Sequence, residues 1–419
     1  HQYGTLKAYV EEKLEILIAR LRGVQALAEL GVISLRNGSP QRTKRAIKIL
    51  EHTIFFYSNH LPVLVSAWST KNENIEPYEI NRDKLITELL LKEKRKVYTF
   101  LDQLIVNPSD IKTNNDEPYK VYGPFYRKWI DIINKTNIAN NNSIQISRTP
   151  ENFRGLKKRE LSLIKNSDLN YCITKESKYI CDLLSSNRFK DTNLCPCKPG
   201  ESESIKQLNF FINSGVINSY NQARDIPSLE STSNLSAALS LGTISCRAVW
   251  NGAQKSKNMA INEYQINSID TWIKELAWRE FYQNALINFP ELEKGPYRKK
   301  WLNFPWQNRP AWLDAWENGL TGIPIVDAAM RQLKDSGWMH NRCRMIVASF
   351  LVKDLLIDWR LGELFFMKSL VDGDLASNNG GWQWSASSGM DPKPMRIFNP
   401  FRQASKFDEN GNYIRKWIP

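Results

Sequence analysis

The segment from residue 371 to residue 395 gathers side chains whose types and spacing suit ligand binding. Two carboxylates surround a glycine, and two asparagines, two glycines and two tryptophans follow, at Asp372, Gly373, Asp374, Asn378, Asn379, Gly380, Gly381, Trp382 and Trp384. Glycines allow another group to approach the backbone closely, while carboxylates, amides and indoles offer hydrogen bonds and flat apolar faces. A buried pair of tryptophans beside a polar loop explains the same residues, so this segment alone leaves both interpretations open.

A segment expected to be a helix adds a possible wall to such a site. In residues 269–286, Glu275 lies one turn before Trp278 and Arg279, so a carboxylate, an indole and a guanidinium share one helix face. That face suits an aromatic cavity with one hydrogen-bonding acid. An amphipathic helix that carries an ion pair has the same pattern.

A second such segment, residues 337–351, contains a histidine that could act as a base. Asn341 and Met345 are four positions apart and share a helix face. His340 lies beside Met and Trp, where a packed histidine is the simpler interpretation. No second histidine and no Ser/His/Asp or metal-ligand spacing accompanies it, so neither hydrolytic chemistry nor a metal site is predicted.

The composition describes a globular and basic protein. The 419 residues are 42% hydrophobic and 11% aromatic, which is too apolar for a disordered chain and enough for two or three domains. No apolar run reaches the roughly 18 residues of a membrane span, and no charged-then-apolar leader is visible, so we expect a soluble, cytoplasmic protein. The formal net charge of +13 favours a polyanionic partner such as nucleic acid.

Four of the six cysteines cluster in a segment rich in Asn, Ser and Lys, at Cys172, Cys181, Cys195 and Cys197. Without a secretory leader we expect them to be reduced thiols. The single residue between the last two does not match the CxxC spacing of usual zinc sites, so no metal is predicted there. The sequence gives the cluster no other role.

The first third of the chain alternates predicted helices and strands. Apolar spacing predicts helices at residues 9–30, 46–57 and 83–97 and strands at residues 32–35, 62–68 and 98–101. This alternation is typical of a parallel α/β sheet, here without its opening strand. Residues 122–126 are expected to form a turn before a short helix through Trp129, and residues 136–203 a long connector with short helices.

From about residue 204 onward, helical spacing continues nearly to the end, so an all-helical domain is predicted. Domains are thus expected at residues 1–135, 136–203 and 204–419. The cluster Ser231–Asn234 is expected to cap a helix that stops at Gly242. Its hydroxyls and the N–H groups of a helix start would also suit a phosphate, although an ordinary cap is the simpler interpretation.

Three tryptophans far apart in the sequence, Trp306, Trp359 and Trp382, could pass an electron if their rings came together. The sequence does not show whether they do, and core packing explains each of them singly.

Four long motifs, in this order, together resemble one known family: residues 224–247, 272–286, 319–360 and 372–392. They look like the flavin domain of the photolyase/cryptochrome family, and most of all like class I cyclobutane pyrimidine dimer photolyases. Residues 75–83 and 119–129 resemble the N-terminal antenna domain of that family more loosely. The resemblance implies an incomplete α/β antenna domain followed by an all-helical domain that binds FAD in a folded shape.

The resemblance also implies roles for individual residues. Flavin contact is expected from Tyr220, Thr232, Ser233, Asn234, Leu235, Ser236, Trp272, Arg344, Asp372, Gly373, Asp374 and Asn378. Arg344 is expected to pair with Asp372 beneath the ring, and Asn378 to tune the flavin near N5. The catalytic set is expected to be Glu275, Asn341, Met345, Asn378 and Trp384. DNA contact is expected from Arg224, Glu275, Trp278, Arg279, Asn341, Arg342, Trp384 and Gln403, and electron transfer from Trp306, Trp359 and Trp382.

The implied function is light-dependent DNA repair. Reduced FAD would pass one electron to a pyrimidine dimer flipped out of UV-damaged DNA, the cyclobutane would split, and the electron would return. An antenna chromophore, methenyltetrahydrofolate or 8-hydroxy-5-deazaflavin, is left undecided, and a monomer without protein partners is expected. The alternatives are a cryptochrome photoreceptor without repair activity and a basic helical nucleic-acid-binding module without a cofactor. A (6-4) photolyase is disfavoured because Asn341 and Met345 stand where a pair of histidines would be needed.

Overall fold

The computed structural model of the chain describes residues 103–136, 194–390 and 397–418, with a few residues between 84 and 97. These residues belong to one compact unit, Lys71–Asn140 and Thr192–Pro419. The elements predicted between residues 9 and 68, the strand predicted at 98–101 and most of the 136–203 connector lie outside the described residues. In the predicted helix 83–97, the described residues from Lys84 to Lys92 are helical.

The prediction of an all-helical domain is confirmed. Its α-helices are α9 (Glu201–Asn213), α10 (Tyr220–Ala223), α11 (Ser236–Leu241), α12 (Cys246–Met259), α13 (Glu263–Asn288), α14 (Pro310–Glu317), α15 (Pro324–Ser336), α16 (Asn341–Ser349), α17 (Trp359–Ser369), α18 (Leu375–Ser385), α19 (Pro400–Phe407) and α20 (Asn412–Trp417). Single turns of 3₁₀ helix lie at Pro108–Asp110, Val216–Ser219, Pro290–Glu293 and Lys299–Trp301, and a π turn at Phe350–Asp354. Within the described residues, strand pairing is limited to one isolated bridge between Lys112 and Pro118. No described helix is long and apolar enough to cross a membrane.

Helix α6 (Tyr122–Thr136) corrects the prediction of a turn at residues 122–126. The helix begins at Tyr122, and Pro124 fits in the first turn because the N–H groups there have no partner within the helix. Phe125, Trp129 and Ile133 follow at intervals of four and form its buried face. The Gly-Pro pair therefore marks the start of this helix rather than a turn before it.

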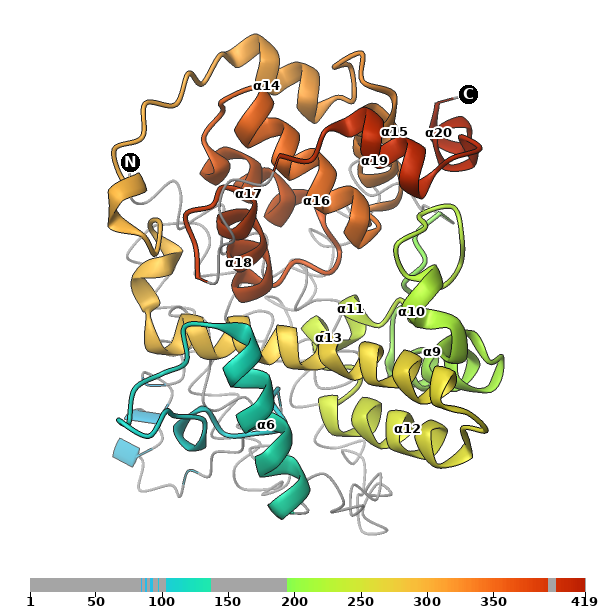
Figure 1. Cartoon of the computed structure of the whole chain (residues 1–419). Coiled ribbons are helices and arrows are strands. Elements are labelled where there is room, and N and C mark those ends of the chain that lie inside the picture. The colour runs from blue at the N-terminus through green and yellow to red at the C-terminus, as the bar shows by residue number, and fades with distance from the viewer. Residues whose placement is uncertain are drawn as a thin grey trace, which may run out of the picture. The chain divides into compact units, whose positions relative to one another are not determined.

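Helix α13 is the element around which the described helices are arranged. In Figure 1 it runs between α6 and α12 on one side and α18 on the other, and all three pack against it. Its inward residues, among them Ile269, Ala277 and Phe281, are almost fully buried. They belong to a first apolar cluster that also includes the buried face of α6.

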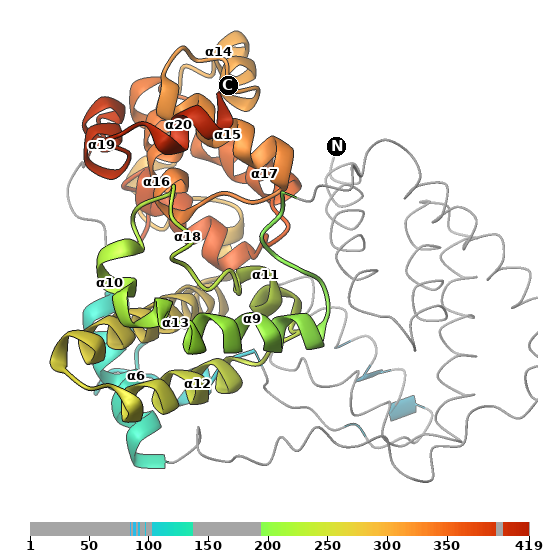
Figure 2. The same cartoon turned by 90° about the vertical axis from the view of Figure 1, so that its right-hand side faces the viewer.

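A second apolar cluster lies among α14–α17 and α20, around Trp316 and Met330. Figure 2 shows these helices at one end of the described part and α9–α13 at the other. Helix α18 joins the two clusters, because its first turn, with Leu375 and Ala376, packs in the first cluster and Trp382 packs in the second.

A buried carboxylate fixes the segment before α6 to α13. Glu280 accepts hydrogen bonds from the backbone N–H of Ile105 at 2.6 Å, from that of Val106 at 3.4 Å and from Trp129 Nε1 at 2.7 Å. All three donors belong to the part of the chain before residue 136. The two sequence segments are therefore held together by one side chain as well as by apolar packing.

Candidate functional site

The ion pair predicted between Arg344 and Asp372 is present. Arg344 Nη2 donates to both carboxylate oxygens of Asp372, at 2.8 and 3.1 Å, while its Nε donates to the backbone oxygen of Met339 at 2.8 Å. The Asp372 side chain is only 1% exposed, and the Arg344 side chain is 24% exposed. The pair joins α16 to the turn before α18 and leaves one edge of a cation open to a ligand.

The start of α18 holds the other predicted flavin residues in fixed positions. Asp374 caps the helix by accepting from the backbone N–H of Ser377 at 2.8 Å, and Ser240 Oγ donates to the oxygen of Gly373 at 3.0 Å. Asn378 Nδ2 donates to the backbone oxygen of Glu363 at 3.0 Å. Because this contact uses the amide nitrogen, it leaves Asn378 Oδ1 as an acceptor for another donor.

The predicted capping role of Ser231–Asn234 is wrong, and the prediction that the helix stops at Gly242 is confirmed. Leu235 occupies the cap position of α11 without a side-chain hydrogen bond, and Thr232 Oγ1 instead donates to Asn234 Oδ1 at 3.0 Å. Asn234 has a positive φ of 50°, which is uncommon outside glycine. Thr232 and Asn234 therefore bind each other, Ser231 binds the backbone oxygen of Ala223, and the exposed Ser236 starts a helix whose N–H groups no side chain caps.

Tyr220 and Trp272 are brought together through Phe211. Both are buried, and their rings lie 6.0 and 5.0 Å from the Phe211 ring. They form part of the first apolar cluster.

Residues predicted to contact DNA converge around Asp225. Arg342 Nη2 lies 2.6 Å from Asp225 Oδ2, and its guanidinium lies 4.3 Å from the centre of the Phe407 ring on α19. Gln403 is four positions before Phe407 and shares its helix face. Arg224 pairs with Glu275 of α13. Two predicted arginines, the predicted carboxylate and α19 thus meet at one surface.

Arg279 lies apart from this group. Its Nη1 donates to the backbone oxygen of Gln103 at 2.7 Å and to Gln283 Oε1 at 2.9 Å. It also lies 3.4 Å from Cys246 Sγ. The guanidinium is thus committed to protein atoms, although Glu275 and Arg279 are one turn apart on the same helix.

Trp278 is flanked by aromatic rings. The Tyr122 ring of α6 stacks on it at 3.6 Å between centroids and 5° between planes, and Tyr122 Oη donates to the backbone oxygen of Lys274 at 2.9 Å. Tyr282 lies 5.7 Å away on the same helix. One face of the Trp278 indole is therefore covered by the protein itself.

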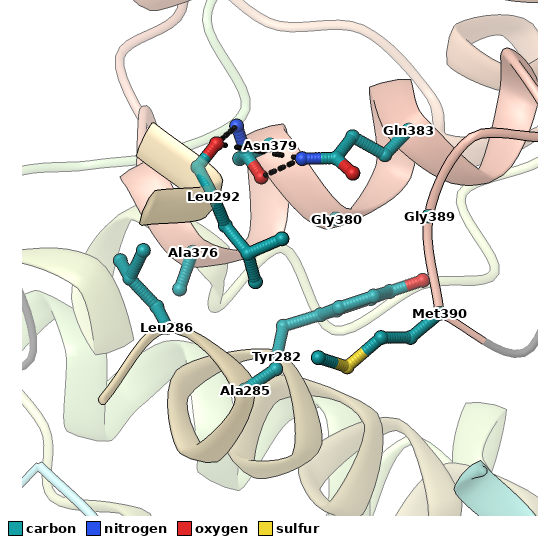
Figure 3. Close-up of a pocket in the computed structure, with 10 residues that line it drawn as sticks. All are labelled: Tyr282, Ala285, Leu286, Leu292, Ala376, Asn379, Gly380, Gln383, Gly389 and Met390. Carbon is teal, nitrogen blue, oxygen red and sulfur yellow. Dashed lines mark hydrogen bonds between the residues drawn. The ribbon is translucent and has the colours of Figure 1, made fainter. Parts of the chain in front are cut away.

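Tyr282 fills the space over Gly380, where α13 and α18 meet (Figure 3). A Cβ on Gly380 would lie 2.1 Å from a carbon of the Tyr282 ring, whereas one on Gly381 would meet nothing within 4 Å. The close approach expected at these glycines is thus made by a tyrosine at Gly380. Gly381 leaves open space on the face of α18 that also carries Asn378.

A small cavity beside Tyr282 is not the ligand site. It holds about 20 Å³ of space that a water molecule could occupy, and it is lined mainly by apolar residues together with Asn379 and Gln383 (Figure 3). Asn379 Nδ2 donates to the oxygen of Leu292 at 2.9 Å, and Gln383 Nε2 donates to Asn379 Oδ1 at 2.8 Å. This volume suits one water and no cofactor.

His340 is a packed residue in the described structure, in agreement with the simpler interpretation. Its Nδ1 accepts from the backbone N–H of Arg342 at 3.2 Å and thereby caps α16, and only 2% of the residue is exposed. Burial lowers the pKa of His340 to about 4. Asn341 and Met345 share a face as predicted, with 3.9 Å between Asn341 Nδ2 and Met345 Sδ.

The three predicted electron-transfer tryptophans all meet the second apolar cluster. Trp359 and Trp382 are buried members of it, and the partly exposed Trp306 packs against it. The Trp382 ring lies against Gly362 of α17, where a Cβ would be 2.2 Å from a ring carbon. Trp384 has different neighbours, with the Phe398 ring 6.0 Å away. The adjacent indoles of α18 therefore face different surroundings.

Comparison with known proteins gives this arrangement its family. The chain matches the model of the FAD binding domain of DNA photolyase over residues 272–419 and that of DNA photolyase over residues 62–141. It is 46% identical to the deoxyribodipyrimidine photo-lyase of Synechococcus sp. over 348 residues, which are 83% of this chain and 68% of the relative. The chain belongs to the DNA photolyase family. The relative of the same name from Escherichia coli is 38% identical, with 97% of this chain and 78% of the relative covered.

A solved photolyase structure agrees with the fold of this family member. A class III photolyase from Agrobacterium tumefaciens superimposes with a TM-score of 0.65 at 36% identity, covering 83% of this chain and 67% of that one. The FAD-binding domain of this photolyase-family chain is the helical domain described above. Its residues fit the cofactor, because Arg344 is paired with Asp372 just before α18, and α18 itself carries the oriented Asn378 and, one turn later, the open side of Gly381.

Three residues that contact predicted site residues were missed in the sequence. Tyr122 was assigned to a turn, although it stacks on Trp278. Glu363, which orients Asn378, and Asp225, which pairs with Arg342, were given no role. A pattern of local spacing could not find these partners, since each contact joins residues from different helices or loops.

Proposed function

We propose that this chain repairs cyclobutane pyrimidine dimers in DNA under light. The observation that carries the proposal is the packing of α13 against α18. It brings the helix with Glu275 and Trp278 against the helix with Asn378 and Trp384. This packing within a FAD-binding domain supports the proposal that α13 carries a lesion-binding wall and α18 a flavin-binding wall. The names of the relatives, deoxyribodipyrimidine photo-lyase, support the same substrate class.

The residues proposed to hold the flavin lie between α10 and α18 in the sequence. They are Tyr220, Thr232, Ser233, Asn234, Leu235, Ser236, Trp272, Arg344, Asp372, Gly373, Asp374 and Asn378. The uncapped start of α11 offers N–H groups to the pyrophosphate. Asn378 Nδ2 donates to the backbone oxygen of Glu363, so Asn378 Oδ1 is left to accept from a donor such as a ring N–H. When bound and reduced, FAD supplies the single electron that light transfers to the lesion.

The residues of α13 are proposed to receive the flipped-out dimer. Tyr122 covers one face of Trp278, so a base can stack only on the other face. Glu275 can hydrogen-bond a pyrimidine carbonyl or N–H and stabilise charge that develops there. Its pairing with Arg224 holds the carboxylate in place before a substrate arrives. Trp384, Asn341 and Met345 are proposed to complete the wall of this cavity.

The surface around Asp225 is proposed to bind the DNA backbone. Arg224, Arg342 and Gln403 gather there and would position phosphates on either side of the flipped nucleotides. Arg279 is left out of this proposal because its guanidinium binds Gln103 and Gln283. The chain as a whole is proposed to act as a cytoplasmic monomer. Its residues 1–135 would form an α/β antenna domain, and residues 136–203 would connect that domain to residues 204–419.

The decisive assay measures dimer loss from UV-irradiated oligothymidylate incubated with the purified chain and reduced flavin. Under blue or near-UV light the absorbance of intact thymines is expected to return, whereas a parallel dark sample stays unchanged. Equal signals in light and dark would refute repair. Purified protein without a flavin spectrum would contradict both repair and a photoreceptor role.

Replacement of Glu275 by alanine tests the substrate side of the cavity separately. We expect Glu275→Ala to lower the repair yield per absorbed photon about tenfold or more, because the charge on the dimer loses its hydrogen-bonding partner. FAD content is expected to stay at the wild-type level. The control is Glu263→Ala, which removes an exposed glutamate from the first turn of the same helix. Loss of FAD from Glu275→Ala would assign this residue to the cofactor instead.

A further inference from the structure

Cys195 and Cys197 form a thiol pair that the repair mechanism does not use. Both residues are half-buried and neither is in a disulfide. Cys195 Sγ lies 3.6 Å from the backbone oxygen of Cys197, and Cys197 Sγ donates to the backbone oxygen of Asn234, also at 3.6 Å. Within the described residues no group of three or more His, Cys, Asp or Glu side chains could hold a metal ion. Thiol chemistry is therefore the chemistry that remains for this pair.

The two thiols have unequal acidity. Interaction with the Cys197 thiol lowers the pKa of Cys195 to about 7, whereas the same interaction and burial raise the pKa of Cys197. The negative charge of Asp372 raises the pKa of both thiols. Cys195 is thus the more acidic thiol of the pair, and Cys197 the one that holds its proton more tightly. A low-pKa thiolate beside a second thiol is the arrangement of a reactive and a resolving cysteine.

The pair touches the loop proposed to hold the flavin. The proton of Cys197 satisfies the backbone oxygen of Asn234, whose φ of 50° makes this loop dependent on its surroundings. Gln207 Nε2 supports the preceding residue by donating to the oxygen of Ser233 at 3.2 Å. Any reaction that removes the Cys197 proton takes away this contact with the loop.

We propose that Cys195 and Cys197 are a redox couple whose oxidation to a disulfide loosens the 232–236 loop and speeds FAD release. This proposal rests on the proposed role of that loop. The oxidant is a low-molecular-weight disulfide. The Cys195 thiolate attacks it, one thiolate leaves, and a mixed disulfide forms. Deprotonated Cys197 then attacks the Cys195 sulfur, the second thiolate leaves, and the proton passes to it. Two cysteine thiols are oxidised and one small disulfide is reduced to two thiols.

The test uses the FAD-loaded full chain with Cys172→Ser and Cys181→Ser, so that the reactive pair is isolated. The protein is held in the dark with glutathione disulfide or with dithiothreitol. Blocking of the remaining thiols, followed by peptide mass mapping, reports whether Cys195 and Cys197 have lost two hydrogens together. The buried Cys246 and Cys343 serve as internal references that should stay reduced. FAD fluorescence after dilution gives the rate of flavin release.

We expect glutathione disulfide to form the Cys195–Cys197 bond and to raise the FAD release rate about tenfold, with reversal by dithiothreitol. Cys195→Ser and Cys197→Ser are each expected to release FAD at the same rate with glutathione disulfide as with dithiothreitol. Serine at position 197 also keeps an O–H donor for Asn234. Absence of the bond, a bond without faster release, or faster release with glutathione disulfide in either single variant would overturn the proposal. A chain that binds no FAD when reduced would contradict the proposed function instead, and the mass map would still report on the couple.

Discussion

Asn378 owes its orientation to Glu363, a residue on another helix. The backbone oxygen of Glu363 accepts from Asn378 Nδ2 at 3.0 Å, and its carboxylate accepts from Asn379 Nδ2 at 2.8 Å. Burial raises the pKa of Glu363 to about 7. One residue of α17 thus fixes both asparagines of α18, of which only the first is proposed to meet the flavin.

Trp306 offers a test of the proposed electron-transfer chain. We expect Trp306→Phe to slow photoreduction of oxidised flavin by an external donor severalfold or more, because phenylalanine is far harder to oxidise than tryptophan. Repair by chemically reduced protein is expected to stay near the wild-type level. Trp312→Phe, at an exposed tryptophan of α14, is the matched control. Lost repair with chemically reduced flavin would place Trp306 in the substrate reaction instead.

Tyr122 offers a test of the aromatic wall. We expect Tyr122→Ala to weaken binding of dimer-containing DNA by about 0.5–1.5 kcal/mol, because Trp278 loses the stacked ring that fixes its orientation. Tyr122→Phe keeps the ring and loses the hydrogen bond to Lys274, so its affinity should be close to wild type. Titration of labelled duplex with and without a dimer measures both variants. Equal loss for undamaged DNA would contradict a role at the lesion.

These contacts show which parts of the site could be predicted from residue types. The pairing of Arg344 with Asp372 was predicted because both residues lie in motifs that resemble the family, and the structure has this pair. The stack of Tyr122 on Trp278 could not be, because it depends on how α6 lies on α13. Roles in flavin, lesion and DNA binding stay predictions.

At the scale of elements, the close approach of α13 and α18 includes a glycine, Gly380, over which the Tyr282 ring lies. We expect Gly380→Ala to destabilise the protein by about 1–3 kcal/mol, because the new methyl group would overlap the Tyr282 ring. Gly381→Ala has open space and is expected to stabilise the helix by about 0.5–1 kcal/mol. Denaturant unfolding of the flavin-free proteins measures both changes. The same sign for the two neighbours would contradict this packing.

Helix positions were easier to predict than helix starts. The long apolar periodicity after residue 204 could only be satisfied by helices, and the structure has them. The start of α6 was misjudged because the Gly-Pro pair has the composition of a turn, and the loop before α11 because Thr232 binds Asn234 instead of the helix. Boundaries depend on such single hydrogen bonds, which composition does not determine.

At the scale of the whole described unit, Glu280 links the segment before residue 136 to the helical domain. We expect Glu280→Gln to lower the free energy of unfolding by about 1–3 kcal/mol, because an amide N–H₂ would face backbone and indole donors. Hydrogen exchange is expected to rise at residues 104–136 and to stay unchanged in α14–α17. Glu263→Gln, at an exposed site of the same helix, is the control.

The pH dependence of this variant gives a second readout. Burial raises the pKa of Glu280 to about 7, so the folded protein binds this proton more tightly than the unfolded chain does. The resulting contribution to stability is fully present below about pH 4.5 and is lost as the pH rises through about 7. The stability difference between wild type and Glu280→Gln should therefore shrink from pH 5 to pH 8. A constant difference would show that Glu280 does not change protonation over this range.

The membership of α18 in both apolar clusters determines the order in which the protein can fold during synthesis. Most of the first cluster has been translated once Leu292 is made, but Met367, Leu375, Ala376 and Met390 are still missing. The growing chain cannot close that cluster from its N-terminal end alone. Apolar surface on α13 stays exposed until almost one hundred further residues have been synthesised. We expect chaperones to bind the nascent chain at this stage.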